Sequence, residues 1–199
     1  MTHHPIRGVL FDLDGTLVDS RLDFDLMRQE MNLPAGVPIL ETLADLPVDE
    51  AERCREILAR HELDGAARAF TIPGVREFLE RLDARAILRG VFTRNTRVLA
   101  LAVLARLELP FELVISRDDG PIKPDPAAIW KTCELWGLSP AEVLVIGDYH
   151  YDLEAGRRAG SPTVLYTAGR DPARWPWAGD ADFILHSFED AESLLFGSL

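Results

Sequence analysis

The stretch Gly8-Val9-Leu10-Phe11-Asp12-Leu13-Asp14-Gly15-Thr16 joins a short apolar run to two aspartates and a glycine. The run at residues 8–11 contains no polar side chain, which favours a strand buried on both faces, as in a parallel sheet. Alternate residues of an extended segment point the same way, so the carboxylates of Asp12 and Asp14 can converge at the end of that strand, and Gly15 permits a sharp departure. Two neighbouring carboxylates repel each other, and a divalent cation usually relieves that repulsion. A pair of turn or helix-capping aspartates would give the same pattern.

Further apolar runs of this kind follow along the chain, with helical patterns between them. Residues 96–107 carry apolar side chains at three- and four-residue spacing, and residues 126–136 form a second helical stretch that stops before Gly137. Ser139-Pro140-Ala141-Glu142 has the form of a capping box and predicts a short helical turn. Alternating strands and helices predict an α/β fold, a Rossmann-like doubly wound parallel sheet. We expect its strands at residues 8–11, 90–93, 113–116, 143–147 and 163–166, with 182–185 as a candidate sixth.

Residues 18–71 interrupt this alternation, because they contain no recognisable strand. Helices are expected at residues 22–32, 39–46 and 49–70, the last as one long helix or two shorter ones. We interpret this segment as a small helical cap inserted into a core domain made of residues 1–17 and 72–199. The alternative is that these helices pack on one face of the sheet.

The composition limits the possible partners. The 199 residues include 33 acidic and 21 basic side chains, a formal charge of −12, so we expect neither nucleic acid nor a membrane as a partner. No apolar run approaches the roughly 20 residues that span a bilayer, and the first residues lack the apolar segment of a signal peptide. Cys54 and Cys133 have no CxxC companion and are expected as reduced thiols. We therefore expect a cytoplasmic protein, whose oligomeric state the sequence does not predict.

Polar side chains suited to the same chemistry follow the later strands. Thr93 ends the second strand, and its hydroxyl, with the backbone amides that open the next helix, could hold a phosphate oxygen. The neighbouring Arg94 could approach that phosphate or pair with an acid. Lys123 lies in a loop restricted by prolines and could aim its ammonium at an anion. Asp148 and Asp152 follow the fourth strand, and their order with the other residues favours one shared site at the carboxyl edge of the sheet.

These motifs resemble those of the haloacid dehalogenase-like hydrolase superfamily, in the subfamily with a helical cap. The segment Asp12-Leu13-Asp14-Gly15-Thr16-Leu17-Val18-Asp19-Ser20 is similar to its first motif, and most similar to that of phosphoglycolate phosphatases with such a cap. The pattern from Gly147-Asp148 to Asp152 is similar to its last motif, and Thr93 and Lys123 occur in the family's order. The resemblance covers nearly the whole chain and implies a phosphoric monoester hydrolase.

The resemblance also implies a role for each carboxylate. Asp12 would be the nucleophile that attacks a phosphoryl group and becomes an aspartyl phosphate. Asp14 would protonate the leaving alcohol and then activate the water that hydrolyses the intermediate. Mg²⁺ would bind Asp12, the main-chain carbonyl of Asp14 and Asp148. Asp152 would lie outside the direct ligands and support them, or would bind the ion through water.

The oxygens of the transferred group would be held by Thr93, Arg94 and Lys123. Positive charge is needed at these oxygens, because a carboxylate cannot approach a phosphate dianion unless positive charge offsets their repulsion. Asp14 also separates two reaction classes: a halide leaving group needs no acid, and the dehalogenases of the superfamily usually lack an aspartate at this place. The substrate that the resemblance implies is a small phosphorylated metabolite.

Two other functions would use the same residues. A sugar phosphomutase of this superfamily would differ in a cap that excludes water, and only the products formed from a hexose 1-phosphate would separate it from a phosphatase. A non-catalytic binding protein on this fold has little reason to keep all these side chains together. Weaker site candidates, each explained more simply as a loop, surface or terminal residue, are His150, Arg21, Arg28 and the pair His3-His4.

Overall fold

The computed structural model describes residues 5–191, which divide into two compact units. The core unit comprises residues 5–19 and 70–191, and the inserted unit comprises Ser20–Ala69. Within the residues described, no helix is at once long enough and apolar enough to cross a bilayer. The role of the inserted unit as a cap stays a prediction.

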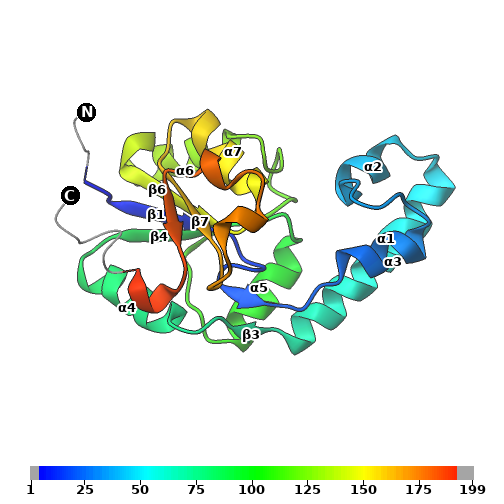
Figure 1. Cartoon of the computed structure of the whole chain (residues 1–199), viewed down its shortest axis with the longest axis horizontal. Helices are drawn as coiled ribbons and strands as arrows, with labels where there is room; N and C mark the ends of the chain where they lie inside the picture. Colours follow the sequence, from blue (N-terminus) through cyan, green and yellow to red (C-terminus); the bar gives the residue numbers. More distant parts are fainter. Residues whose placement is uncertain (1–4, 192–199) are drawn as a thin grey trace. The chain divides into compact units, whose positions relative to one another are not determined.

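The sheet of the core unit consists of β1 (Gly8–Phe11), β4 (Leu88–Phe92), β5 (Leu113–Ile115), β6 (Val143–Gly147), β7 (Thr163–Tyr166) and β8 (Phe183–Leu185). These strands are all parallel and lie in the order β5-β4-β1-β6-β7-β8 (Figure 1). β1 pairs with β4 on one side and with β6 on the other, so the chain fills one half of the sheet and then the other. This order confirms the predicted doubly wound α/β fold, including the candidate sixth strand.

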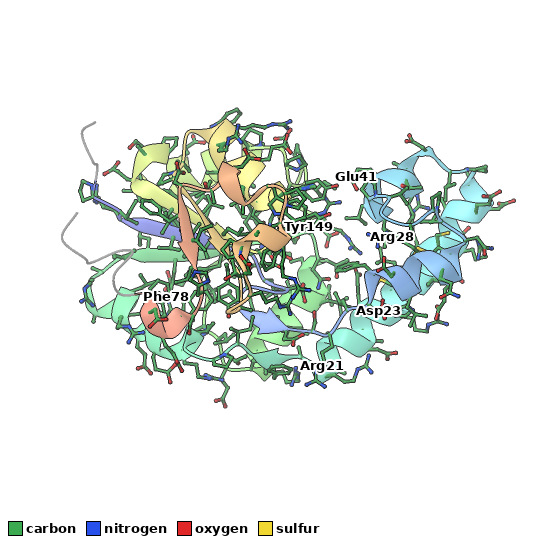
Figure 2. All side chains as sticks on the ribbon, in the orientation of Figure 1. Arg21, Asp23, Arg28, Glu41, Phe78 and Tyr149 are labelled. Carbon is green, nitrogen blue, oxygen red and sulfur yellow. The ribbon has the colours of Figure 1, made fainter. Side chains whose placement is uncertain are left out.

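The helices of the core unit are α4 (Val75–Ala84), α5 (Arg97–Arg106), α6 (Ala127–Trp136) and α7 (His150–Ala159). Figure 1 shows α6 and α7 on one face of the sheet and α4 on the other. The strand β1 serves both faces, because Leu10 joins an apolar cluster with residues of α6 and α7, whereas the ring of Phe11 lies edge-on to that of Phe78 on α4, 6.1 Å between centroids. Phe78 is labelled in Figure 2. Continuous burial along β1 therefore reflects packing on two sides, as its sequence predicts.

Local sequence signals explain where α5 begins and where α6 ends. Thr96 caps α5 by accepting a hydrogen bond from the N–H of Leu99 at 3.4 Å. α6 ends at Gly137, whose φ of 64° is the left-handed conformation that terminates many helices. Both helices lie where the sequence predicts them.

A short antiparallel ribbon marks where the chain leaves and re-enters the core unit. It consists of β2 (Val18–Asp19) and β3 (Phe70–Thr71), with Val18 opposite Thr71 and Asp19 opposite Phe70. The expectation that residues 18–71 contain no strand is therefore wrong at both ends. Two residues are too few to show the alternation by which a strand is recognised in a sequence.

The inserted unit contains three helices, α1 (Phe24–Met31), α2 (Ile39–Asp45) and α3 (Val48–Arg68). α3 is one continuous helix, which decides between the two forms expected there. Asp23 caps α1 through the N–H of Leu26 at 2.9 Å. The unit has its own apolar cluster, which contains Met27, Met31, Ile39, Leu43, Cys54 and Leu58.

Candidate active site

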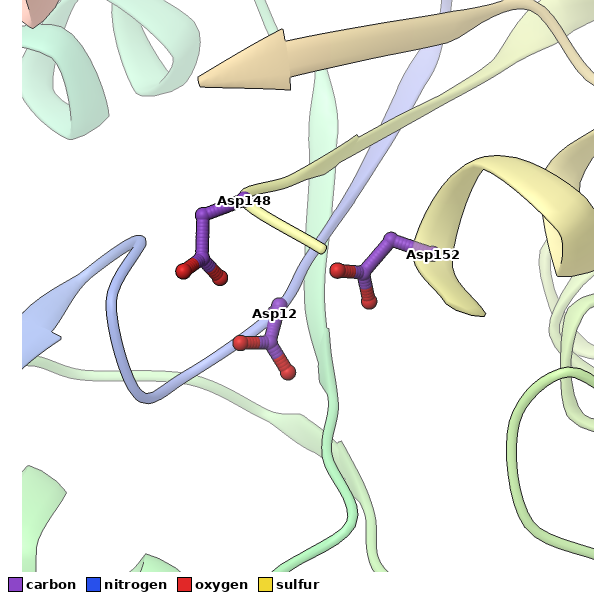
Figure 3. A group of neighbouring side chains, drawn as sticks. All are labelled: Asp12, Asp148 and Asp152. Carbon is purple, nitrogen blue, oxygen red and sulfur yellow. The ribbon is translucent and has the colours of Figure 1, made fainter. Parts of the chain in front are cut away.

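Three carboxylates face a common space at the carboxyl edge of the sheet (Figure 3). Asp12 follows β1, Asp148 follows β6, and Asp152 lies in the first turn of α7. Their ligand oxygens all lie within 4.8 Å of one another. The N–H of Asp12 donates to the carbonyl of Ile146 at 2.8 Å, so the ladder between β1 and β6 continues up to the site and fixes its spacing. The neighbouring parallel strands β1 and β6 thus bring together Asp12 and Asp148, which are 136 positions apart in the sequence.

Lys123 lies between two of these carboxylates. Its ammonium is 2.5 Å from Oδ1 of Asp12 and 2.6 Å from Oδ1 of Asp152, and the residue is only 2% exposed. The same ammonium lies 4.8 Å from the centre of the Phe92 ring. The loop that carries Lys123 is anchored by Arg94, whose guanidinium donates to the carbonyl of Lys123 at 2.9 Å. The residue predicted to point at an anion is therefore buried beside the predicted nucleophile.

The electrostatics of the site leave negative charge to be balanced. Burial raises the pKa of Asp12 to about 7, with Lys123 opposing the rise and Asp152 adding to it. Burial and the charges of Asp12 and Asp152 raise the pKa of Asp148 well above its ordinary value. Burial alone would lower the pKa of Lys123, but the two carboxylates outweigh it and the pKa is raised. One lysine cannot neutralise three carboxylates, so this set of hard oxygen ligands fits a divalent cation such as Mg²⁺.

Asp14 and Thr93 are connected through Asn95. The side-chain amide of Asn95 donates to Oδ2 of Asp14 at 3.3 Å, and its backbone N–H donates to Oγ1 of Thr93 at 3.0 Å. The hydroxyl proton of Thr93 has no acceptor within residues 5–191, which leaves it available for a phosphate oxygen. The sequence pattern indicates a role only for the backbone amides that open this helix, and the contact of the Asn95 side chain is found in the structure. A helix-opening asparagine gave no signal that distinguished it from a cap.

Gly15 and Thr16 complete the first turn of the site. Gly15 has a φ of 90°, and a Cβ on it would lie 2.4 Å from a carboxylate oxygen of Asp148. The hydroxyl of Thr16 donates to Oδ1 of Asp148 at 3.4 Å. The turn after β1 therefore packs directly on a predicted metal ligand, which explains the need for glycine there.

Asp152 uses both of its carboxylate oxygens. Oδ1 accepts from Lys123, and Oδ2 accepts from the N–H of Tyr149 at 3.1 Å, in the first turn of α7. A negative charge at this end also complements the helix dipole. This geometry agrees with a supporting place for Asp152 beside the other carboxylates.

The structure also gives the contacts of Arg94 and of the weaker candidates, and the expected role of Arg94 at a phosphate stays a prediction. The guanidinium of Arg94 stacks 4.4 Å from the Tyr151 ring in addition to its bond to the lysine loop. His150 packs against the rings of Tyr149 and Tyr151, and burial lowers its pKa. Arg28 donates to the carbonyl of Val37 and to Asp25 within the inserted unit, each at 2.8 Å. Arg21, labelled in Figure 2, is exposed and has a φ of 50°. His3 and His4 lie outside the described residues.

Known proteins are similar to this chain in sequence and in fold. The chain is 30% identical to the phosphoglycolate phosphatase of Nitrosospira multiformis, over 96% of each chain. It is 31% identical to the N-acetylmuramic acid 6-phosphate phosphatase of Pseudomonas putida, over 82% of this chain and 84% of that protein. The crystal structure of a hydrolase from Pseudomonas syringae superposes with a TM-score of 0.78 at 27% identity, over 96% of this chain and 98% of that one.

Residues 21–166 match the family described as haloacid dehalogenase-like hydrolase. That match begins after Asp12 and Asp14, but an alignment over 96% of 199 residues, such as that with the Nitrosospira protein, has to include them. The family match covers well over half of the chain, and the resemblance drawn from the motifs is confirmed. The chain belongs to the haloacid dehalogenase-like hydrolase family.

Proposed function

We propose that this protein is a phosphatase that hydrolyses a small phosphorylated metabolite through a phosphorylated Asp12, with Mg²⁺ as cofactor. One observation carries the proposal: the ammonium of Lys123 lies 2.5 Å from Asp12, on the same sheet edge as Asp148 and Asp152. A buried cation and a cluster of acids at one point suit phosphoryl transfer, which depends on positioning and charge compensation.

The residues would act in two steps. Asp12 attacks phosphorus, so that a carboxylate–phosphorus bond forms while the bond from phosphorus to the substrate oxygen breaks, and Asp14 gives its proton to that oxygen. Asp14 then takes a proton from water, the resulting oxygen attacks the phosphorus of the intermediate, and the carboxylate of Asp12 leaves. Inorganic phosphate is released, Asp12 is again a carboxylate, and Asp14 again carries its proton.

Other residues of the site hold charge and position. Lys123 neutralises phosphoryl oxygens as they approach Asp12, and the Thr93 hydroxyl donates to another. Arg94 supports the carbonyl of Lys123 and thereby keeps its loop in place. Asp12, Asp148 and the main-chain carbonyl of Asp14 would hold Mg²⁺, whose chemistry is to offset the charge of the phosphoryl oxygens.

The similar proteins support the reaction class. The names of both curated relatives given above describe phosphatases that act on phosphate esters of small molecules. Asp14 favours the same class over dehalogenation, because an alcohol leaving group needs a proton and a halide does not. The two names give different substrates, so the natural substrate of this protein has to be identified by experiment.

The test is release of phosphate from p-nitrophenyl phosphate by the full-length chain. We expect hydrolysis that EDTA abolishes and MgCl₂ restores, and Asp12→Asn should lower kcat by about 10³-fold or more. Asp14→Asn should lower kcat by about 10² to 10⁴-fold. Asp83→Asn is the matched control, since Asp83 is an exposed carboxylate paired with Arg89 at the surface. Full activity of Asp12→Asn would exclude Asp12 as nucleophile, and transfer of phosphate between positions of a hexose 1-phosphate would identify a mutase instead.

A further inference from the structure

A cavity of about 450 Å³ opens beside the candidate active site, entirely within the core unit. Gly15 and Asp148 form its inner end, where it meets the carboxylate cluster. Its walls come from the ribbon of β2 and β3 and from the loops that follow β7 and β8. The cavity therefore extends along the carboxyl edge of the sheet, away from β4 and toward β8, where open α/β sheets bind their ligands.

The lining of the cavity combines aromatic faces with polar groups. Phe70, Tyr166 and Trp175 contribute rings, whereas Arg170 and His186 contribute nitrogen donors. Its size is in the range of pockets that hold small-molecule ligands, about 300 to 1,000 Å³, and a two-carbon leaving group would leave most of it unfilled. Rings and a few directed polar groups are the usual lining of such pockets. This composition suits a leaving group that itself has a ring.

Backbone hydrogen bonds hold the loop that carries Arg170, whereas the guanidinium of Arg170 makes no hydrogen bond or ion pair with the described residues. The N–H of Arg170 donates to the carbonyl of Thr167 at 3.0 Å, and the N–H of Gly169 donates to the carbonyl of His186 at 2.8 Å. Oγ1 of Thr167 and Nδ1 of His186 lie 2.9 Å apart, which ties the two loops together. Within residues 5–191 the Arg170 guanidinium has neither a hydrogen bond nor an ion pair. An arginine presented by an ordered loop at a cavity wall is suited to bind a carboxylate in bidentate form.

We propose that this cavity receives the leaving group of the substrate, and that the preferred substrates are phosphate monoesters whose leaving group has a ring and an anionic substituent that pairs with Arg170. This inference rests on the proposed phosphatase function. It gives the substrate a definite orientation: the phosphoryl group lies at Asp12, the ring lies between aromatic walls past Asp148, and the anionic group lies at the β7 loop. The protein's charge of −12 makes such a preference unexpected without a dedicated cation.

The experiment compares 3-carboxyphenyl phosphate with phenyl phosphate. The two esters differ in one carboxylate, and a meta carboxylate hardly changes the acidity of the leaving phenol. We expect kcat/KM to be about tenfold higher for the carboxylated ester, mainly through KM, since a charge-assisted hydrogen bond at a partly exposed site is worth about 1.4 kcal/mol. Arg170→Gln should bring the ratio of the two kcat/KM values to about one, and Arg170→Lys should restore part of it.

Arg174→Gln is the matched control, because Arg174 is an exposed arginine four residues further on that does not line the cavity. That variant should keep the wild-type ratio. Calorimetric titration with 3-hydroxybenzoate, the leaving alcohol, measures the cavity without catalysis. Binding to the wild type but not to Arg170→Gln, with neither ester hydrolysed, would support the cavity and refute the phosphatase function. Hydrolysis of both esters with equal kcat/KM, or an unchanged ratio in Arg170→Gln, would refute the cavity inference and leave the phosphatase function standing.

Discussion

The carboxyl group of Asp12 makes the stability of the metal-free protein depend on pH. Burial raises its pKa to about 7 in the folded chain, whereas its ordinary value is 3.8. Between these values the folded state binds a proton that the unfolded state lacks, so this group lowers stability as the pH rises. We predict that the melting temperature of the EDTA-treated protein falls by about 5 °C between about pH 5 and pH 7.5. Adding MgCl₂ at the higher pH should restore it, because the ion binds the ionised carboxylates.

Two variants separate the contribution of Asp12 from that of the rest of the chain. Asp12→Asn cannot ionise and should show a smaller fall across the same pH window, while the surface variant Asp83→Asn should behave like the wild type. Differential scanning fluorimetry measures both. An unchanged slope in Asp12→Asn would show that this carboxyl group titrates normally.

Asn95 is predicted to position Asp14, the proposed acid of the reaction. Its side-chain amide donates to Asp14 at 3.3 Å, and the residue is 8% exposed. Asn95→Ala removes a hydrogen bond to Asp14 worth about 1 kcal/mol, so kcat on p-nitrophenyl phosphate should fall by about fivefold while KM changes little. Steady-state kinetics beside a urea titration distinguish this from general damage. A variant with wild-type kcat, or one that loses activity only in proportion to unfolded protein, would contradict this role.

At the scale of elements, the junction between β6 and α7 sets the position of Asp152. A Cβ on Gly147 would lie 2.1 Å from Cγ of Asp152, and that carboxylate is already held by Lys123 and Tyr149. We predict that Gly147→Ala displaces the start of α7, lowers kcat/KM by about 100-fold and lowers the melting temperature by about 5 °C. The control is Gly179→Ala, since a Cβ on Gly179 meets nothing within 4 Å. Equal behaviour of the two variants would show that the junction tolerates a methyl group.

The elements that sequence alone predicted share a strong local signal. The buried strands are continuous apolar runs. α5 has a capping threonine at its start, and α6 has a glycine at its end. α4 received no prediction although Val75, Phe78, Leu79 and Leu82 form an amphipathic pattern, because it has no side-chain cap and begins after a glycine. The strands β2 and β3 could not be recognised, since two residues are too few to show a periodicity and their pairing joins residues about 50 positions apart.

The candidate site was predictable to the extent that each residue directly follows a strand. Asp12 and Asp148 directly follow the neighbouring strands β1 and β6, and the parallel order of these strands alone brings the two carboxylates together. The loop of Lys123 carried no such constraint, and only the motif order placed it there. Two features could not be predicted: the hydrogen bond between Asn95 and Asp14, and the cavity beside Arg170. Both depend on the directions of side chains from several elements, and these directions cannot be derived from a single sequence.

At the scale of the whole molecule, the two units have separate apolar clusters. The cluster of the core unit includes Leu10, Ile129 and Val145, and that of the inserted unit includes Met27 and Leu58. No residue belongs to both. Each unit therefore has a buried apolar cluster of its own.

The ribbon of β2 and β3 offers a way to test whether the core unit folds without the inserted unit. Asp19 and Phe70 are directly opposite each other in antiparallel pairing, so a two-residue Asn-Gly turn can replace the segment Ser20–Ala69 between them. Every residue proposed to take part in phosphoryl transfer lies in the core unit. We predict that the shortened chain unfolds cooperatively and retains Mg²⁺-dependent hydrolysis of p-nitrophenyl phosphate within about 100-fold, while discriminating less among metabolite esters. A folded variant without any hydrolysis, judged by circular dichroism and phosphate release, would show that the inserted unit supplies part of the chemistry.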